Sequence, residues 1–210
     1  MSLMARLKEE TAAQHAHAES RPLEQAMVGG QVARESYVEL LAQRYLIHRE
    51  LEERVRGLRV AHPFIAAIVE DQLFQESNLA ADLRFFGREP ESCRPLPSTR
   101  RFLEDVRAAA DQNPMSLLGV YYVFEGSKNG ARFVAKRIAP ALGVGEAGGL
   151  RYLDPHGDEQ RTLWREFKAR MDNAGFSPTD QDAMVSAAKM TFDAVSAIDD
   201  ELHQRIAASS

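Results

Sequence analysis

The sequence predicts an all-α protein, a bundle of about eight helices in a single domain that spans residues 1–210. Apolar residues recur three or four positions apart through most of the chain, which is the spacing of amphipathic helices. No segment alternates apolar and polar residues with the period of two that a half-buried strand shows. The length suits one domain with a substantial core, and 44% hydrophobic with 27% charged residues is typical of a globular chain.

Four helices are expected in the first half of the chain, over residues 3–19, 34–58, 63–72 and 75–86. Pro63 suits the first turn of the third helix, because a proline there loses no helical hydrogen bond. Gly87 ends the fourth, and the proline-rich residues 88–97 form a loop.

Four more helices are expected in the second half, over residues 99–112, 114–142, 157–173 and 178–206. Ser98 is the expected N-cap of the first of these. Four glycines within residues 143–155 predict a loop. Ser177 followed by Pro178 is a strong start for the last helix, with a capping hydroxyl ahead of a proline.

Charge, cysteine content and apolar runs exclude several classes of protein. A net charge of −5 and a pI near 5.7 argue against a general nucleic-acid binder, which needs a basic surface. Cys93 is the only cysteine, so neither an internal disulfide nor a cysteine zinc site is expected. The longest apolar run, 115–124, is about half of the ~20 residues that cross a bilayer, and the N-terminus lacks a signal-peptide segment. We therefore expect a cytoplasmic protein with no membrane contact.

His15 is the first candidate for chemistry, because Glu19 lies four residues later on the same helical face. A metal-bound imidazole needs an acceptor at its second nitrogen, which fixes the tautomer and the ring direction. His17 points about 200° away and cannot serve the same ligand. The alternative is a solvent-facing histidine–glutamate pair.

A second candidate is the glycine pair of the segment Tyr-Val-Phe-Glu-Gly-Ser-Lys-Asn-Gly-Ala, residues 122–131. Gly126 and Gly130 share a helix face. Each lowers helix stability by up to ~1 kcal/mol relative to alanine, so we expect the pair to have a structural or functional role. Together they leave bare backbone that a flat ligand approaches closely, with the small polar Ser127 beside it. The alternative is a groove for close helix packing.

Two lysines are candidates for binding the carboxylates of a ligand. Lys8 lies two helical turns before His15, and Lys168 belongs to the late helix. For each of them the alternative is an ordinary solvated charge.

These segments resemble a known family. LKEETAAQHAHAE (residues 7–19) is similar to the N-terminal signature of the haem oxygenases. YVFEGSKNGA (residues 122–131) resembles the distal helix of their compact soluble bacterial members. The resemblance extends over nearly the whole chain and implies that His15 is the iron ligand, with Glu19 as its acceptor. It also implies roles for further residues: haem contacts at Lys8, Tyr122 and Lys168, a pocket-wall or network role for Tyr45, and a catalytic distal surface made by Gly126, Ser127 and Gly130.

The resemblance implies that haem is both cofactor and substrate and is cleaved to biliverdin, carbon monoxide and ferrous iron. Electrons would come from an external reductase or a ferredoxin-like partner, since the sequence has no dinucleotide-binding fingerprint. Animal members have aspartate where this chain has Ser127. The following Lys128-Asn129 pair is more polar than the family pattern, which puts distal closure and turnover in question.

Three alternatives are weighed against this assignment. A haem-binding carrier or sensor would keep His15 but lack turnover. A di-iron protein would need paired Glu-x-x-His motifs, and only a lone Asp200-x-x-His203 occurs. A thiamine-salvage hydrolase would need a nucleophilic cysteine, whereas Cys93 falls in the proline-rich loop.

Overall fold

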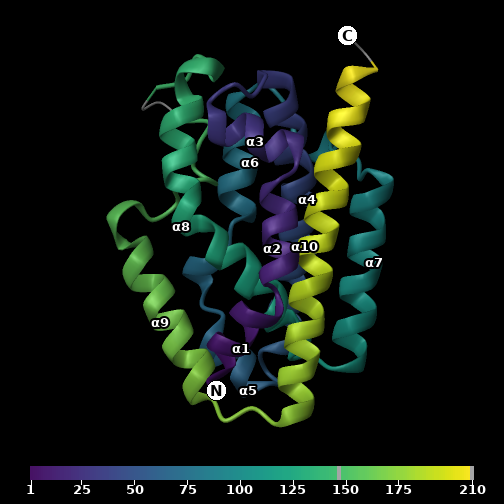
Figure 1. Ribbon diagram of the computed structural model, residues 1–210, viewed down its shortest axis with the longest axis vertical. Helices are drawn as coiled ribbons and strands as arrows, with labels where there is room; N and C mark the ends of the chain where they lie inside the picture. Colours follow the sequence, from purple (N-terminus) through teal and green to yellow (C-terminus); the bar gives the residue numbers. More distant parts are fainter. Residues whose placement is uncertain (146–147, 209–210) are drawn as a thin grey trace.

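A computed structural model describes residues 1–145 and 148–208, and within these residues the chain forms ten α-helices, three short 3-10 helices and no strand (Figure 1). The α-helices are α1 (Leu3–Glu10), α2 (Ala12–Glu19), α3 (Pro22–Gly29), α4 (Arg34–Leu58), α5 (Pro63–Ile68), α6 (Glu76–Phe85), α7 (Pro97–Gln112), α8 (Ser116–Leu142), α9 (Gln160–Asn173) and α10 (Pro178–Ala207). The 3-10 helices are η1 (Asp71–Leu73), η2 (Pro90–Ser92) and η3 (Gly157–Glu159). The all-α prediction is confirmed, with two helices more than expected.

The longest helix, α10, is the axis against which most of the bundle packs. It contacts α8 most extensively, and α1, α2, α3, α4 and α7 also lie against it. At the crossing of α8 and α10, a Cβ atom on Gly119 would lie 2.1 Å from the main-chain oxygen of Met184. Only glycine permits this approach, so Gly119 sets the distance between the two longest helices.

The N-terminal region differs from the single helix expected over residues 3–19. The chain breaks at Thr11, where φ is −104° and ψ is 3°, and the Thr11 hydroxyl donates a hydrogen bond to the main-chain oxygen of Leu7. Such a bond competes weakly with the helical ladder. Thr191 and Ser196 make the same bond within the unbroken α10, so it does not by itself account for the break. A further short helix, α3, begins at Pro22 and was not expected.

Two helix starts test the capping predictions. Ser177 accepts a hydrogen bond from the main-chain nitrogen of Asp180 at 3.2 Å, which confirms it as the cap of α10. The prediction for Ser98 is wrong: α7 begins at Pro97, and the Ser98 hydroxyl instead donates to Glu201 of α10 at 2.6 Å. The Ser98 hydroxyl, which the local sequence predicts as a helix cap, thus forms its hydrogen bond with a carboxylate of a distant helix.

Buried apolar side chains form one cluster to which every α-helix contributes. Its largest fully buried side chains include Tyr37, Tyr121, Phe102 and Phe167. Across the part of the chain that the structure describes, none of the helices has the length and apolar character needed to cross a bilayer.

Candidate functional site

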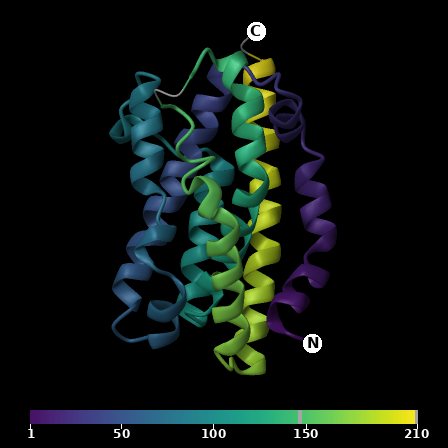
Figure 2. The ribbon, with the colours of Figure 1, turned by 90° about the vertical axis from the view of Figure 1, so that its left-hand side faces the viewer.

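His15 occupies the middle of α2, a helix that lies along α10 at the edge of the molecule (Figure 2). Its ring meets the Phe192 ring of α10 edge-on, with centroids 5.2 Å apart. Its Nδ1 lies 3.6 Å from a carboxylate oxygen of Glu19, so the pair expected from the spacing forms. The His15 side chain is 54% exposed, which leaves Nε2 as the nitrogen available to a ligand.

The glycine face of α8 is open at one position and covered at the other. No side chain or neighbouring element comes within 4 Å of an ideal Cβ on Gly130. At Gly126 the same atom would lie 3.6 Å from the indole of Trp164 on α9. The Ser127 hydroxyl donates a hydrogen bond to the main-chain oxygen of Phe124 at 2.9 Å, so its proton is already bound within its own helix. Gly126 therefore packs against an aromatic ring, and Gly130 faces open space.

Two residues contact α8 at separate places: Thr11, just before α2, and Gly30, just after α3. The Thr11 hydroxyl interacts with the Tyr122 phenol, and Gly30 approaches so closely that a Cβ would lie 2.9 Å from the main-chain oxygen of Arg137. The helix rises about 22 Å between Tyr122 and Arg137. Between these contacts α2 packs on α10, leaving His15 and Gly130 uncovered. We call the stretch of surface that runs from His15 on α2 to Gly130 on α8 the α2–α8 gap.

Tyr122, Trp164 and Lys168 gather beside one end of this gap. The Tyr122 and Trp164 rings are 6.0 Å apart, and the Lys168 ammonium lies 5.6 Å from the Trp164 ring centroid. Burial raises the pKa of the Tyr122 phenol, and the contact with Thr11 opposes that rise. The phenol is therefore a neutral hydrogen-bond donor at neutral pH.

Two other expected residues are placed differently. Lys8 is exposed on α1. The expected shared face of Lys8 and His15 depended on one continuous helix, and the break at Thr11 places the two residues on different helices. Tyr45 is buried on α4, where it lines a cavity of about 500 Å³ between α4 and α6. His15 lines neither this cavity nor the one beside Lys128, so a haem contact for Tyr45 stays a prediction.

A buried polar cluster behind α8 was not found from the sequence. The Lys128 ammonium lies 2.5 Å from the Glu125 carboxylate, and both side chains are 3% exposed. On α4, His48 lies 3.7 Å from Glu52, whose carboxylate accepts the main-chain N–H of residues 75 and 76. Burial raises the pKa of Glu125 and lowers that of His48. The only sign of these pairs in the sequence is their i, i+3 or i, i+4 spacing. Ion pairs on an exposed helix surface have the same spacings, so the sequence does not show that these pairs are buried.

The structure also bears on the rival interpretations. Among the described residues, no group of three or more histidine, cysteine, aspartate or glutamate side chains is arranged to hold a metal ion, as a di-iron site would require. Cys93 is buried, and burial raises the pKa of its thiol, the opposite of what an activated nucleophile needs.

Comparison with known proteins decides the family. The family model described as "Heme oxygenase" matches residues 1–198. The chain belongs to the haem oxygenase family. A heme oxygenase of Pyropia yezoensis is 24% identical over 195 residues, covering 91% of this chain and 82% of that protein.

Solved haem oxygenases have the same fold. The structure from Leptospira interrogans superposes with a TM-score of 0.88 at 22% identity, covering 96% of this chain and 100% of that one. The structure of heme oxygenase-2 from Synechocystis sp. PCC 6803 in complex with heme and NO superposes with a TM-score of 0.91 at 22% identity. The superposition covers 100% of this chain and 88% of that one.

Proposed function

We propose that this protein is a haem oxygenase that binds haem in the α2–α8 gap, with His15 as the iron ligand. The observation that carries the proposal is the placement of His15, whose Nδ1 faces Glu19 while the rest of the ring borders the gap. Haem iron is commonly held by a neutral histidine whose second nitrogen is fixed by an acceptor.

The residues around the gap fit a flat ligand with carboxylate tails. Phe192 offers an apolar edge beside His15, and Gly130 presents no side chain at its open position on α8. Lys168 and the Tyr122 phenol supply a cation and a donor for propionates, and Lys8 on the neighbouring α1 is a further candidate.

Each of these residues has a distinct task in the proposed reaction. When bound, haem supplies both the iron that activates dioxygen and the ring that is opened to biliverdin, with release of carbon monoxide and ferrous iron. Glu19, whose carboxylate lies 3.6 Å from Nδ1 of His15, would accept a hydrogen bond from the Nδ1–H group and so fix the tautomer. Gly130 keeps its part of the α8 surface free of bulk, Gly126 lies under the Trp164 indole, and Ser127 keeps its hydroxyl bonded to the main-chain oxygen of Phe124. The buried polar cluster on the far side of α8 holds that helix in place.

We also propose that electrons come from a separate reductase or ferredoxin-like protein and that the reaction takes place in the cytoplasm. The lone cysteine suits a reducing compartment. The single core cluster supports one domain over the whole chain.

The test is to add haemin to the purified protein, then a reductant and air, and to follow the Soret band. Loss of the band with formation of biliverdin supports the enzyme. A stable haem spectrum would refute turnover and identify a carrier or sensor instead.

A matched pair of variants tests the ligand itself. His15→Ala should lose the ferric and ferrous spectra of a histidine-ligated haem. His17→Ala, two residues along the same exposed helix, should keep them. Equal spectra in the two variants would show that His15 is not the iron ligand, whether or not the protein degrades haem.

A further inference from the structure

Trp164 on α9 covers part of the glycine face of α8. Tyr122, Gly126 and Gly130 recur every four residues, so they share this face and follow one another about 6 Å apart along the helix. The Trp164 ring centroid lies 6.0 Å from that of Tyr122, and the indole lies 3.6 Å from an ideal Cβ on Gly126. At Gly130, no atom that the structure describes outside α8 comes within 4 Å of the same Cβ. The indole therefore covers the first two positions and ends before the third.

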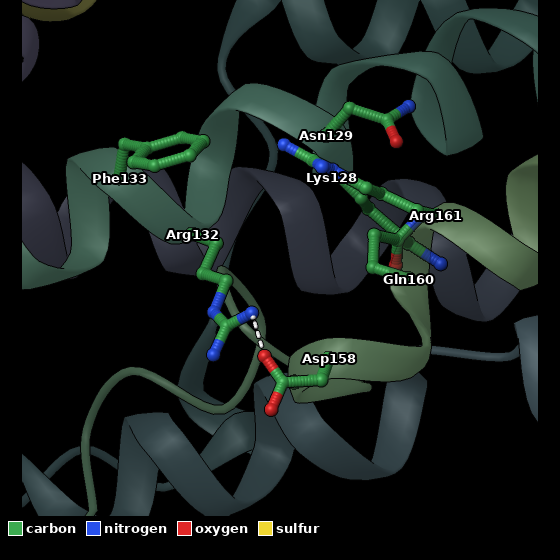
Figure 3. Close-up of a pocket in the computed structure, with 8 residues that line it drawn as sticks. Lys128, Asn129, Arg132, Phe133, Asp158, Gln160 and Arg161 are labelled. Atoms are coloured by element: carbon green, nitrogen blue, oxygen red, sulfur yellow. Dashed lines mark hydrogen bonds and ion pairs between the residues drawn. The ribbon is translucent and has the colours of Figure 1, made fainter.

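Packing fixes the position of this indole. Trp164 stacks on Phe167 of the same helix, with ring centroids 5.5 Å apart and an angle of 14° between the planes, and the Phe167 side chain is fully buried. Gln160, the first residue of α9, is 6% exposed and its amide has no hydrogen-bond partner among the described residues, so packing holds this end of the helix. At the same junction, Asp158 just before α9 pairs with Arg132 of α8 (Figure 3). Trp164 is thus part of a wall that a ligand meets already formed.

The indole restricts how a flat ring can lie against α8. Trp164 is only partly buried, so it presents a free aromatic surface beside the open position at Gly130. A ring that rests on Gly130 meets the indole on the side toward Gly126, because the two cannot occupy the same space. Lys168 lies beside the indole, with its ammonium 5.6 Å from the centroid of the Trp164 ring. One side of the site therefore combines an aromatic wall with a cation.

We propose that Trp164 fixes the rotation of haem within its site and so decides which bridging carbon of the ring is cut. This inference rests on the proposed function. A single axial bond from His15 to the iron leaves the ring free to turn about that bond, so contacts at the ring edge must set its rotation. Lys168 holds a propionate, and the indole beside it excludes orientations that turn a bulkier edge toward Gly126. Those orientations become available only when the indole is removed.

Fluorine NMR tests the contact without turnover. Because the chain has a single tryptophan, incorporation of fluorotryptophan gives a signal from Trp164 alone. Zinc protoporphyrin, which supplies the ring but no iron chemistry, should move this signal through its ring current, an effect confined to nearby nuclei. The absorbance of the porphyrin reports its binding separately. Binding that leaves the signal in place would overturn the inference and leave the proposed haem site intact, whereas no binding of either zinc protoporphyrin or haemin would refute the site as well.

The biliverdin isomers formed from haemin test the consequence. Wild type should give a single isomer, and Trp164→Ala should change the product to a mixture. Trp164→Phe keeps an aromatic ring and should retain the wild-type product. The matched control Phe85→Ala, which removes an exposed aromatic ring from α6 outside the gap, should do the same. A substitution that only destabilises the protein lowers the total yield without changing the ratio of isomers. A mixture from wild type, or a single isomer from Trp164→Ala, would overturn the proposal.

Discussion

Replacing Lys128 with methionine should destabilise the fold in a pH-dependent way. Methionine keeps most of the length of the side chain but removes the ammonium that lies 2.5 Å from the Glu125 carboxylate. Both side chains are 3% exposed, so water cannot replace the lost partner. Breaking a buried ion pair by removing one member costs about 3–5 kcal/mol, because the other charge is left uncompensated.

The sign of the pH dependence follows from Glu125. Burial raises its pKa above the ordinary value of 4.5, and nearby Glu52 raises it further. A carboxyl group whose pKa is higher in the folded state stabilises the fold when protonated, and this stability is lost as pH rises through the folded pKa. Without Lys128 the folded pKa rises again. The penalty of Lys128→Met is therefore largest in alkaline solution and shrinks as Glu125 takes up a proton.

Urea unfolding followed by far-UV circular dichroism, near pH 8 and near pH 5.5, measures this penalty. We expect a loss of about 3 kcal/mol or more at the higher pH, equivalent to a fall in Tm of roughly 6–12 °C for a domain of this size. The double variant Glu125→Gln, Lys128→Met removes both charges and should show a small penalty that does not depend on pH. A single-variant penalty below about 1 kcal/mol, or one equal at both pH values, would refute the reasoning.

Three further predictions concern the helices around the site. Gly119→Ala should lower the free energy of unfolding by about 3 kcal/mol or more, because its Cβ would lie 2.1 Å from the main-chain oxygen of Met184; a denaturation curve like that of wild type would contradict this. Trp164→Ala should uncover Gly126 and speed haemin association in stopped-flow absorbance, and an unchanged rate would show that the indole does not restrict entry. Burial raises the pKa of Asp199 to about 7, so the wild-type protein should lose stability as pH rises through about 7, and Asp199→Asn should flatten that profile. If unfolding measured across this range shows the same slope in both proteins, Asp199 is not the group responsible.

The all-α class and most helix positions could be predicted from the sequence, because they depend on local periodicity. The spacing over residues 34–58 gave the bounds of α4, and Ser177 with Pro178 marked the start of α10. The pairing of His15 with Glu19 follows from helix geometry in the same way. The family assignment rested on two short motifs, which the match over residues 1–198 confirms.

Other features depended on contacts between distant segments. Ser98 looks like a helix cap, but Glu201, more than a hundred residues away, takes its hydroxyl. Gly126 and Gly130 look alike in sequence, yet Trp164 covers one and leaves the other open.

The sequence by itself determined which residues share a helix face, because the helical repeat relates positions three and four apart. Only the tertiary structure decided which faces are buried and against what. Lys128 and Glu125 form a pair that would be unremarkable at a surface, and the packing of α4 and α8 turns it into a desolvated ion pair. Gln160 gained its unpaired amide in the same way, because desolvation depends on neighbours that the helical repeat does not specify.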